Sequence, residues 1–297
     1  MGMKKKVLIV GSDSAIGTEI VNHFKDKYDL IGLSRKKINN SITNHVFDLD
    51  KTDISGLPDI SADICIVFSS ITDIDVCEKF PKKAFKTNVE GTKKIFDALK
   101  INKIKRLIYF STGTVVSGYD TPMNENMTPS PPNVYSVTKH LAEKEIKNYS
   151  EFFDSIVIRP FFVYGPNTRH NRLIYNLITN IAKKNTINLN IDAKPKINPI
   201  YIDDVIQIIQ LLVENKNNIS FDCINIAGNE VVSIKELAEK ISKILKTSII
   251  FKESENNSKN IIADITKLKE KYNYKFQFKL DEGLERMIFA MQNKNLI

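Results

Sequence analysis

The sequence predicts an α/β protein whose main part is a doubly wound parallel sheet. In the first half of the chain, short apolar runs alternate with amphipathic stretches of helical spacing. A glycine-containing turn joins the first apolar run, residues 7–10, to the first helical stretch. With 297 residues, the chain is long enough for one large core or two unequal ones. We therefore expect a sheet domain and a smaller C-terminal α/β part.

Six apolar runs are expected to form the strands of the sheet, because each is short, apolar and bounded by polar or turn residues. They are residues 7–10, 30–33, 45–47, 64–68, 107–110 and 155–158. A proline-rich stretch at residues 129–132 favours an extended loop. This loop should bring the helix that follows it to the carboxyl edge of the sheet, where ligands bind in such folds.

The pattern changes from about Arg159 onward, where helices and short strands replace the regular alternation. Ser233, with Glu236 three residues later, forms a capping box at the start of one of these helices. We expect residues 1–160 to form the sheet domain and residues 161–297 to form a smaller substrate-binding part. Two segments are expected to return to the sheet domain, near residues 199–213 and 221–228.

The first strand leads directly into the sequence Gly11-Ser-Asp-Ser-Ala-Ile-Gly17. Strand, glycine turn and helix are the context in which a loop holds a dinucleotide pyrophosphate at a helix N-terminus. Gly11 would permit the tight turn, and Gly17 the close approach of helix to strand. An ordinary turn between strand and helix is the alternative. The residues expected to contact the cofactor here are Gly11, Ser14, Ala15, Ile16 and Gly17.

Tyr135 and Lys139 place a phenol and an ammonium on the same face of a predicted helix. At ~5 Å and an effective dielectric constant of about 20, the attraction between a phenolate and an ammonium is roughly 3 kcal/mol, or about two pKa units. Such an attraction favours proton exchange between a tyrosine and a substrate near neutral pH. A solvated helix face is the alternative, because both residue types are common.

Composition argues against several classes of function. The apolar fraction of 42% and the charged fraction of 26% are ordinary for a globular protein. No apolar run approaches the ~18 residues of a membrane span, so we expect a cytoplasmic protein. Cys65, Cys77 and Cys223 lack a CxxC spacing and the four histidines form no ligand pattern, so no metal is expected. The net charge of +8 is spread along the chain, which does not indicate nucleic-acid binding.

The glycine loop, Ser111-Thr112 after the strand at 107–110, and the pair Tyr135 and Lys139 together resemble the extended short-chain dehydrogenase/reductase family, also called the NAD-dependent epimerase/dehydratase family. The resemblance implies a Rossmann-type sheet and an enzyme that acts on a nucleotide sugar. The family's loop usually reads G-x-x-G-x-x-G, whereas Ser14 stands here at the middle glycine. A serine fits at that position if its backbone is not left-handed.

Residues 69–78 read S-S-I-T-D-I-D-V-C-E, and Pro81, Ala84 and Asn88 follow. This stretch resembles the dTDP-4-dehydrorhamnose reductase branch, which typically reads A-A-Y-T-x-V-D-x-C-E before the same three residues. Members of that branch reduce the C4 ketone of a nucleotide-linked 4-keto-6-deoxy sugar. The resemblance implies NADPH-dependent reduction of such a sugar and, as a family expectation, a homodimer.

By this resemblance Tyr135 is the proton donor, Lys139 modifies its pKa and anchors the ribose, and Thr112 polarises the carbonyl. In a second alignment, to the epimerase branch, the catalytic position falls on Gly113 and the hydroxyl is lost. We favour the first alignment. Asn88 would organise the strand-to-helix region and a proton-relay water that also serves the cofactor site, or would simply position a helix.

The end of the second strand decides the cofactor, because an acidic residue there binds the ribose of NAD and an arginine accommodates the 2′-phosphate of NADP. Ser34 and Arg35 stand there without an acidic residue, which favours NADP(H), with NAD(H) possible. Further cofactor contacts are implied at Asp48, Leu49, Phe68 and Ser69. Substrate contacts are implied at Thr72, Arg159, Arg169 and Arg172, the arginines being candidates for the diphosphate.

Other functions on the same fold stay open. Dehydration in this family needs an acid–base pair after the catalytic Thr, but Gly113 and Thr114 occupy those places. An epimerase acting at C3 or C5 needs a further acid or base, and His170 is the nearby candidate. A cofactor-binding regulatory subunit without catalysis is the third possibility, because related sequences of the branch have that role.

Overall fold

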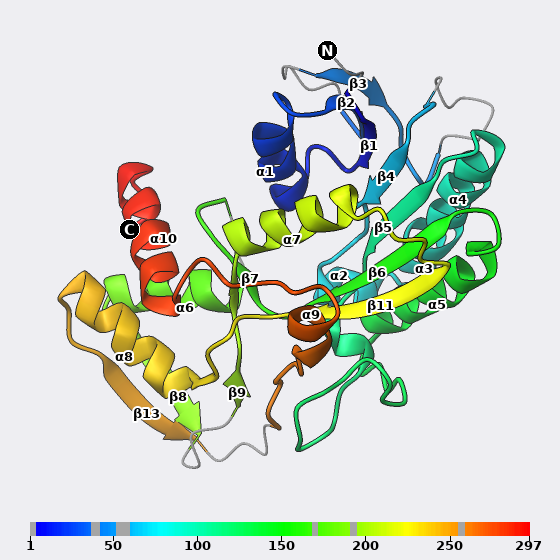
Figure 1. The fold of residues 1–297 in the computed structure, drawn as a ribbon. Coiled ribbons are helices and arrows are strands. Elements are labelled where there is room, and N and C mark those ends of the chain that lie inside the picture. Colours follow the sequence, from blue (N-terminus) through cyan, green and yellow to red (C-terminus); the bar gives the residue numbers. More distant parts are fainter. Residues whose placement is uncertain (1–3, 37–41, 52–59, 168–171, 191–194, 255–258) are drawn as a thin grey trace. The chain divides into compact units, whose positions relative to one another are not determined.

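The computed structural model describes residues 4–36, 42–51, 60–167, 172–190, 195–254 and 259–297 (Figure 1). The chain divides into two compact units. The first consists of Met1–Val116, Thr128–Arg159 and Ile209–Ile224, and the second of Ser117–Met127, Pro160–Ile208 and Asn225–Ile297.

A seven-stranded sheet forms the centre of the first unit, with strand order β11-β6-β5-β4-β1-β2-β3. Its strands are β1 (Lys6–Val10), β2 (Asp29–Ser34), β3 (Thr43–Val46), β4 (Ile64–Val67), β5 (Arg106–Phe110), β6 (Asp154–Pro160) and β11 (Phe221–Ile226). The pairs from β6 to β3 run parallel. The order reverses between β1 and β4, which is the topological switch point where such sheets bind ligands. The predicted doubly wound sheet is confirmed, with all six expected strands in it.

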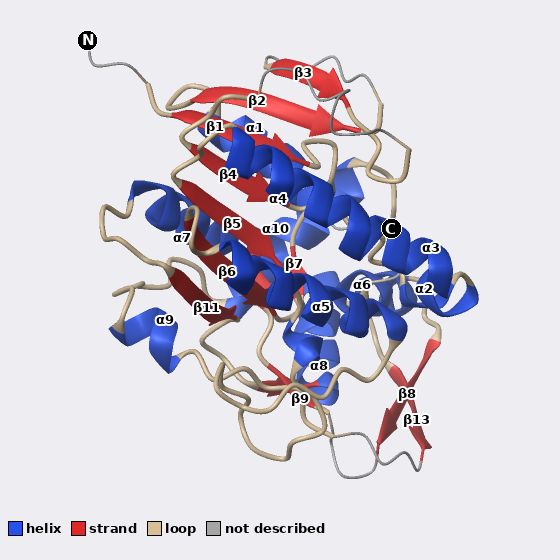
Figure 2. Cartoon of the chain, turned by 90° about the vertical axis from the view of Figure 1, so that its right-hand side faces the viewer, coloured by secondary structure: helices blue, strands red, loops and turns tan. Residues whose placement is uncertain are grey.

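Helices cover this sheet because their apolar faces match the apolar strands. The helices of the first unit are α1 (Ala15–Phe24), α2 (Ile74–Lys79), α3 (Pro81–Phe85), α4 (Thr92–Ile101) and α5 (Val134–Tyr149). Figure 2 shows α4 and α5 in front of the strands. Their buried side chains join those of β1, β4 and β5 in one hydrophobic cluster, for example Phe96, Ile146 and Tyr109.

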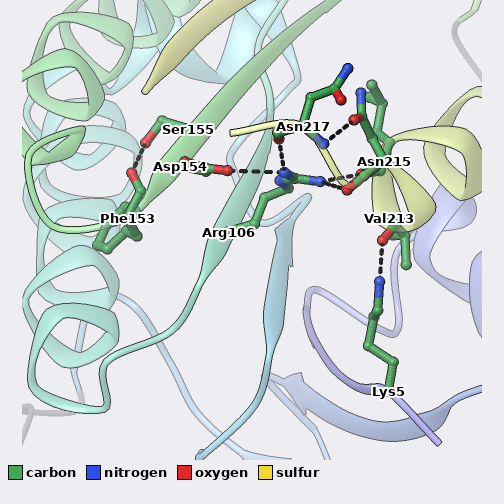
Figure 3. Close-up of polar contacts among 9 residues, drawn as sticks. Lys5, Arg106, Phe153, Asp154, Ser155, Val213, Asn215 and Asn217 are labelled. Carbon is green, nitrogen blue, oxygen red and sulfur yellow. Dashed lines mark hydrogen bonds and ion pairs between the residues drawn. The ribbon is translucent and has the colours of Figure 1, made fainter. Parts of the chain in front are cut away.

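The amino edge of the same sheet is held by Arg106 at the start of β5 (Figure 3). Its guanidinium donates to the Leu212 and Asn217 carbonyls at 3.0 and 2.8 Å and to Asp154 Oδ2 at 2.9 Å. Lys5 Nζ donates to the Val213 carbonyl at 2.7 Å. The Leu212 and Val213 carbonyls belong to the last turn of α7 (Ile202–Glu214), where the helix leaves carbonyls without partners, and Asn217 lies in the loop that follows.

The second unit contains helices and short strand pairs. Its elements are β7 (Val163–Tyr164), α6 (Leu173–Ala182), β8 (Thr186–Asn190), β9 (Lys196–Ile197), β10 (Ile200–Tyr201), β12 (Val232–Ser233), α8 (Ile234–Leu245), β13 (Ile250–Ser254), α9 (Thr266–Glu270) and α10 (Leu280–Asn293). The predicted capping box starts α8: Ser233 Oγ accepts from Glu236 N at 3.1 Å, and Glu236 Oε2 accepts from Ser233 N at 2.7 Å.

The boundary between the units differs from the predicted one in residues 117–127, which belong to the second unit. The backbone explains this: Met123 N donates to the Ile262 carbonyl at 2.8 Å, and Asp264 N donates to the Met123 carbonyl at 2.8 Å. Of the segments expected to return, 209–213 and 221–224 lie in the first unit, while 199–208 and 225–228 lie in the second.

Candidate active site

The glycine loop between β1 and α1 makes a tight turn. Gly11 has φ +90°, a conformation that other residues adopt only with strain, and its N–H donates to the Leu33 carbonyl at 2.7 Å. A Cβ on Gly11 would lie 2.7 Å from Ser69 Oγ, and a Cβ on Gly17 would lie 2.2 Å from the Gly11 carbonyl oxygen. Larger residues would therefore collide with the chain itself, so both glycines are needed for the close packing of the loop against the end of β4 and the start of α1.

Ser14 is the N-cap of α1 and explains why a serine stands at the middle glycine of the motif. Its backbone is extended, with φ −72° and ψ 161°, so no glycine is required. Its hydroxyl accepts from Gly17 N at 3.0 Å. The loop residues thus fit a dinucleotide pyrophosphate at a helix N-terminus.

At the end of β2, Ser34 and Arg35 have different environments. Ser34 is 3% exposed, and its hydroxyl lies 2.6 Å from the Lys36 carbonyl and 2.8 Å from Asn44 Oδ1. Asn44 Nδ2 in turn donates to Ser12 Oγ at 2.8 Å. Arg35 is exposed. The Ser34 hydroxyl therefore bonds inside the protein, where it links β2 to β3, and its contact with a 2′-phosphate stays a prediction.

The other predicted cofactor residues follow the carboxyl ends of strands. Phe68 N and Ser69 N donate to the Val10 carbonyl at 2.8 and 3.2 Å, which places both residues beside the glycine loop. Asp48 and Leu49 follow β3, where Asp48 Oδ1 accepts from Asp50 N at 3.0 Å and the Leu49 side chain is buried. All lie in the first unit.

Asn88 lies in a π-helical turn, Lys86–Gly91, and is fully buried. Its Oδ1 accepts from Ile71 N at 2.7 Å, and its Nδ2 donates to the Ile71 carbonyl and to Thr138 Oγ1, both at 3.0 Å. One side chain therefore joins the loop that carries Thr72 to the helix that carries Tyr135 and Lys139. Single π-turns recur at functional sites. The contacts of Asn88 are those of a residue that positions a helix, and its contact with the cofactor stays a prediction.

Helix α5 begins at Val134 with Asn133 as its N-cap, and Asn133 Oδ1 accepts from Ser136 N at 2.9 Å. Tyr135 is half-buried in its first turn. Lys139 is 1% exposed, with Nζ 4.1 Å from the ring centroid of Tyr109. Burial lowers the pKa of Lys139 to about 7, against the opposing attraction of Glu143. This buried, readily neutralised lysine is an unusual group outside functional sites.

The hydroxyls on either side of Gly113 converge. Gly113 is buried in a short 3₁₀ turn, and Thr112 Oγ1 lies 2.9 Å from Thr114 Oγ1. Thr114 Oγ1 lies 2.8 Å from Ser136 Oγ. This row of hydroxyls connects the end of β5 to the neighbour of Tyr135 on α5. Two hydroxyls, those of Thr112 and Thr114, therefore flank the buried Gly113.

Arg159 lies at the end of β6 and forms an ion pair inside the first unit. It is 6% exposed, and its Nε and Nη2 donate to Glu143 at 3.1 and 2.7 Å. The sequence suggested a contact with the substrate diphosphate, but the guanidinium is bonded to a buried carboxylate instead.

Arg172 is exposed at the N-cap of α6 in the second unit, and Arg169 and His170 lie outside the described residues.

Glu143 was not found by sequence reasoning, although its position four residues after Lys139 placed it on the same helix face. Its carboxylate also accepts from Ser111 Oγ.

Within the part of the chain that the structure describes, no group of three His, Cys, Asp or Glu residues has the geometry to hold a metal ion. None of the described helices is long and apolar enough to cross a membrane.

Comparison with known proteins identifies two relatives of similar sequence. UDP-glucuronate 4-epimerase of Thermodesulfobacterium geofontis is 26% identical in a match that covers 71% of this chain and 67% of that protein. The dTDP-4-dehydro-6-deoxyglucose reductase of Escherichia coli is 26% identical, with 70% of this chain and 68% of that protein covered. The matches thus span about two thirds of the length of these two relatives.

A solved structure shows the same fold. UDP-glucuronic acid 4-epimerase from Bacillus cereus, in complex with UDP-glucuronic acid and NAD, has a TM-score of 0.88 and 24% identity, with 97% of this chain and 99% of that chain covered. Residues 7–227 also match the model of the NAD dependent epimerase/dehydratase family. Since that match spans well over half of the sequence and includes the glycine loop and the Tyr135 helix, the chain belongs to the NAD dependent epimerase/dehydratase family.

Proposed function

We propose that the chain inverts the configuration at C4 of a nucleotide-linked sugar, with NAD(P) bound at the glycine loop. One observation supports chemistry on a cofactor-bound sugar: the glycine loop after β1, Thr112 after β5, and Tyr135 and Lys139 on α5 all lie in the first unit. The names of the relatives support a nucleotide-sugar substrate and, for several of them, inversion at C4. Bound NAD(P) would accept and return a hydride at the sugar carbon.

The chain's own residues supply the proton chemistry. Tyr135 takes the proton from the sugar hydroxyl and returns it to the same oxygen, and the Thr112 hydroxyl holds that oxygen. Lys139, when charged, favours the phenolate form of a nearby tyrosine. Inversion at C4 needs only this one acid–base group, whereas inversion at C3 or C5 needs another on the opposite face.

Reduction of a 4-keto sugar, the reaction that the sequence favoured, is the second candidate. The reductase-like stretch at residues 69–78 supports it, because Asn88 ties this loop to α5 through Ile71 and Thr138. The Escherichia coli relative is named as a reductase of this kind. A reductase uses the same residues and differs in releasing the oxidised cofactor after each turnover. Dehydration lacks a similar observation, because Gly113 and Thr114 provide no acid–base pair.

The test combines two assays of the purified protein. The first follows inversion at C4 by NMR in UDP-, dTDP- and GDP-linked sugars, and the second follows oxidation of NADPH or NADH by nucleotide-linked 4-keto-6-deoxy sugars. Inversion without net cofactor consumption establishes the epimerase, and stoichiometric oxidation establishes the reductase. Cofactor binding with neither reaction contradicts both and favours the regulatory subunit.

We also propose NADP(H) as the preferred cofactor, with Arg35 as the cation for the 2′-phosphate. No acidic residue stands between Ser34 and Phe47 in the sequence, so no carboxylate at this strand end repels the phosphate. Replacing Arg35 by Ala should raise the Kd for NADPH about tenfold, because a charge-assisted hydrogen bond contributes about 1.5–3 kcal/mol. The Kd for NADH should stay unchanged.

Fluorescence titration of both nucleotides measures this difference. Lys147→Ala, which removes an exposed cation from the last turn of α5, is the matched control and should change neither Kd. Equal affinities for NADH and NADPH in the unmodified protein, unaltered by Arg35→Ala, would contradict the preference and favour NAD(H), the cofactor named for the Bacillus cereus structure.

A further inference from the structure

We propose that Glu143 is a positioning residue for the proton transfer: it clamps the strand end that carries Thr112 to the helix that carries Tyr135, and it keeps Lys139 charged. This inference rests on the proposed function of Tyr135 and Lys139. It concerns a residue that contacts neither cofactor nor substrate in the argument above and acts through its neighbours.

The clamp joins three elements at one carboxylate. Glu143 follows Lys139 by one helical turn on α5 and is 6% exposed. It accepts from Arg159 Nε and Nη2 on β6, at 3.1 and 2.7 Å, and from Ser111 Oγ at the end of β5. Ser111 directly precedes Thr112, and its N–H donates to the Ile158 carbonyl at 2.8 Å. Movement of α5 along the sheet would break these bonds together.

A buried ion pair at this place is not explained by stability alone. Removing a carboxylate and a guanidinium from water is costly, and apolar residues of similar size often serve the fold equally well. The neighbouring faces of α5 are apolar, with Ala142 and Ile146 fully packed. The polar clamp therefore points to a function that an apolar contact does not provide, namely a fixed negative charge beside the catalytic lysine.

Three basic side chains surround Glu143. Lys139 and His140 face it from α5, with His140 Nδ1 at 4.0 Å, and Arg159 faces it from β6. Two uncharged residues also lie there, Tyr109 on β5 and Ser111 directly after it, and the Tyr109 ring lies against the Lys139 ammonium. Because burial lowers the pKa of Lys139 to about 7 and Glu143 opposes that change, loss of the carboxylate would lower the pKa further. The positive charge of Arg159, no longer opposed by this carboxylate, would act in the same direction.

The test compares Glu143→Gln with Glu145→Gln, which removes a carboxylate two residues further along the same helix, on another face. For each variant, kcat/KM for the nucleotide sugar is measured from pH 5.5 to 9.5. Glu143→Gln should move the alkaline limb of the profile down by about one pH unit, because a nearby opposite charge changes a pKa by about that much or more. Glu145→Gln should leave the profile in place. A uniform loss at every pH would show a structural role alone and overturn the inference.

A second variant separates the effect of the lost carboxylate from the effect of an unpartnered buried charge on folding. In the double variant Glu143→Gln/Arg159→Gln both buried charges are replaced by amides, and its alkaline limb should still lie below that of the unmodified protein. An unchanged limb there overturns the inference. Absence of activity in the unmodified protein with every nucleotide sugar would instead refute the proposed function. The two failures can therefore be distinguished.

If the unmodified protein shows no activity, the charge of Lys139 is measured by a method that does not depend on catalysis. The free energy of unfolding is measured against pH for each carboxylate variant, with and without Lys139→Met. The rise in stability that depends on Lys139 should begin at a lower pH in Glu143→Gln than in Glu145→Gln. An identical onset in the two variants contradicts the inference.

Discussion

Replacing Tyr135 by Phe is expected to lower turnover by about 10²–10⁴-fold, the usual contribution of a general acid–base group. The change removes only the phenolic oxygen, which is the atom that exchanges the proton with the sugar. The N-cap of α5 by Asn133 and the bond between Thr114 and Ser136 do not involve this oxygen, so the helix start should persist. The Kd for NAD(P) should therefore stay within about twofold of its original value, below about 0.4 kcal/mol.

Tyr149→Phe is the matched control, because it removes the same oxygen from the last residue of the same helix. Its hydroxyl bonds to Asp97 and Lys93 at the surface of α4, away from the row of hydroxyls. Steady-state kinetics and cofactor titration on both variants test the assignment. Turnover retained in Tyr135→Phe, or lost equally in Tyr149→Phe, would remove Tyr135 from the proposed mechanism.

Much of the fold follows from local sequence patterns. A parallel sheet buried on both faces needs continuous apolar strands, so runs such as 64–68 and 107–110 were recognisable before any tertiary contact was known. The strained turn at Gly11 and the close contact at Gly17 likewise require residues without a Cβ. The cap made by Ser14 is also local, since its partner is only three residues away.

The environments of single side chains depend on partners far along the chain and were predicted less well. Arg159 was expected at a substrate diphosphate because arginine suits phosphate, but a carboxylate 16 residues earlier occupies it. Ser34 bonds to Asn44 across the β2–β3 pair, which no local pattern reveals. The polarity of a residue indicates that it needs a partner, whereas the topology decides which partner it meets. Homodimerisation and a cytoplasmic location stay predictions.

Replacing Lys139 by Met should stabilise the protein while removing most of its activity. The buried ammonium is costly to desolvate, and Met fills a similar volume without charge. We expect a gain of about 1–2 kcal/mol in the free energy of unfolding at pH 7, which is typical of relieving one unfavourable group. Turnover should fall by roughly 10²-fold or more, because Tyr135 loses the charge that favours its phenolate.

The pKa of Lys139 determines whether the free energy of unfolding rises or falls with pH. Burial lowers the pKa of Lys139 from 10.5 to about 7, so between these values the unfolded chain binds more protons than the folded one. Stability therefore rises with pH in this window, by up to about 1.4 kcal/mol per pH unit. Lys139→Met lacks this rise. Burial also raises the pKa of the Cys65 thiol, but that effect is present in both proteins and cancels in the difference.

Urea unfolding at pH 6, 7, 8 and 9 measures both proteins under the same conditions. Below pH 7 the lysine is charged in the folded and the unfolded chain, so the two stability curves should run parallel there. Above pH 7 they should converge and then cross before pH 9, because the unmodified protein alone gains stability as Lys139 loses its proton. Curves that stay parallel up to pH 9 would show that Lys139 keeps its charge, and the carboxylate of Glu143 would then outweigh burial at this site.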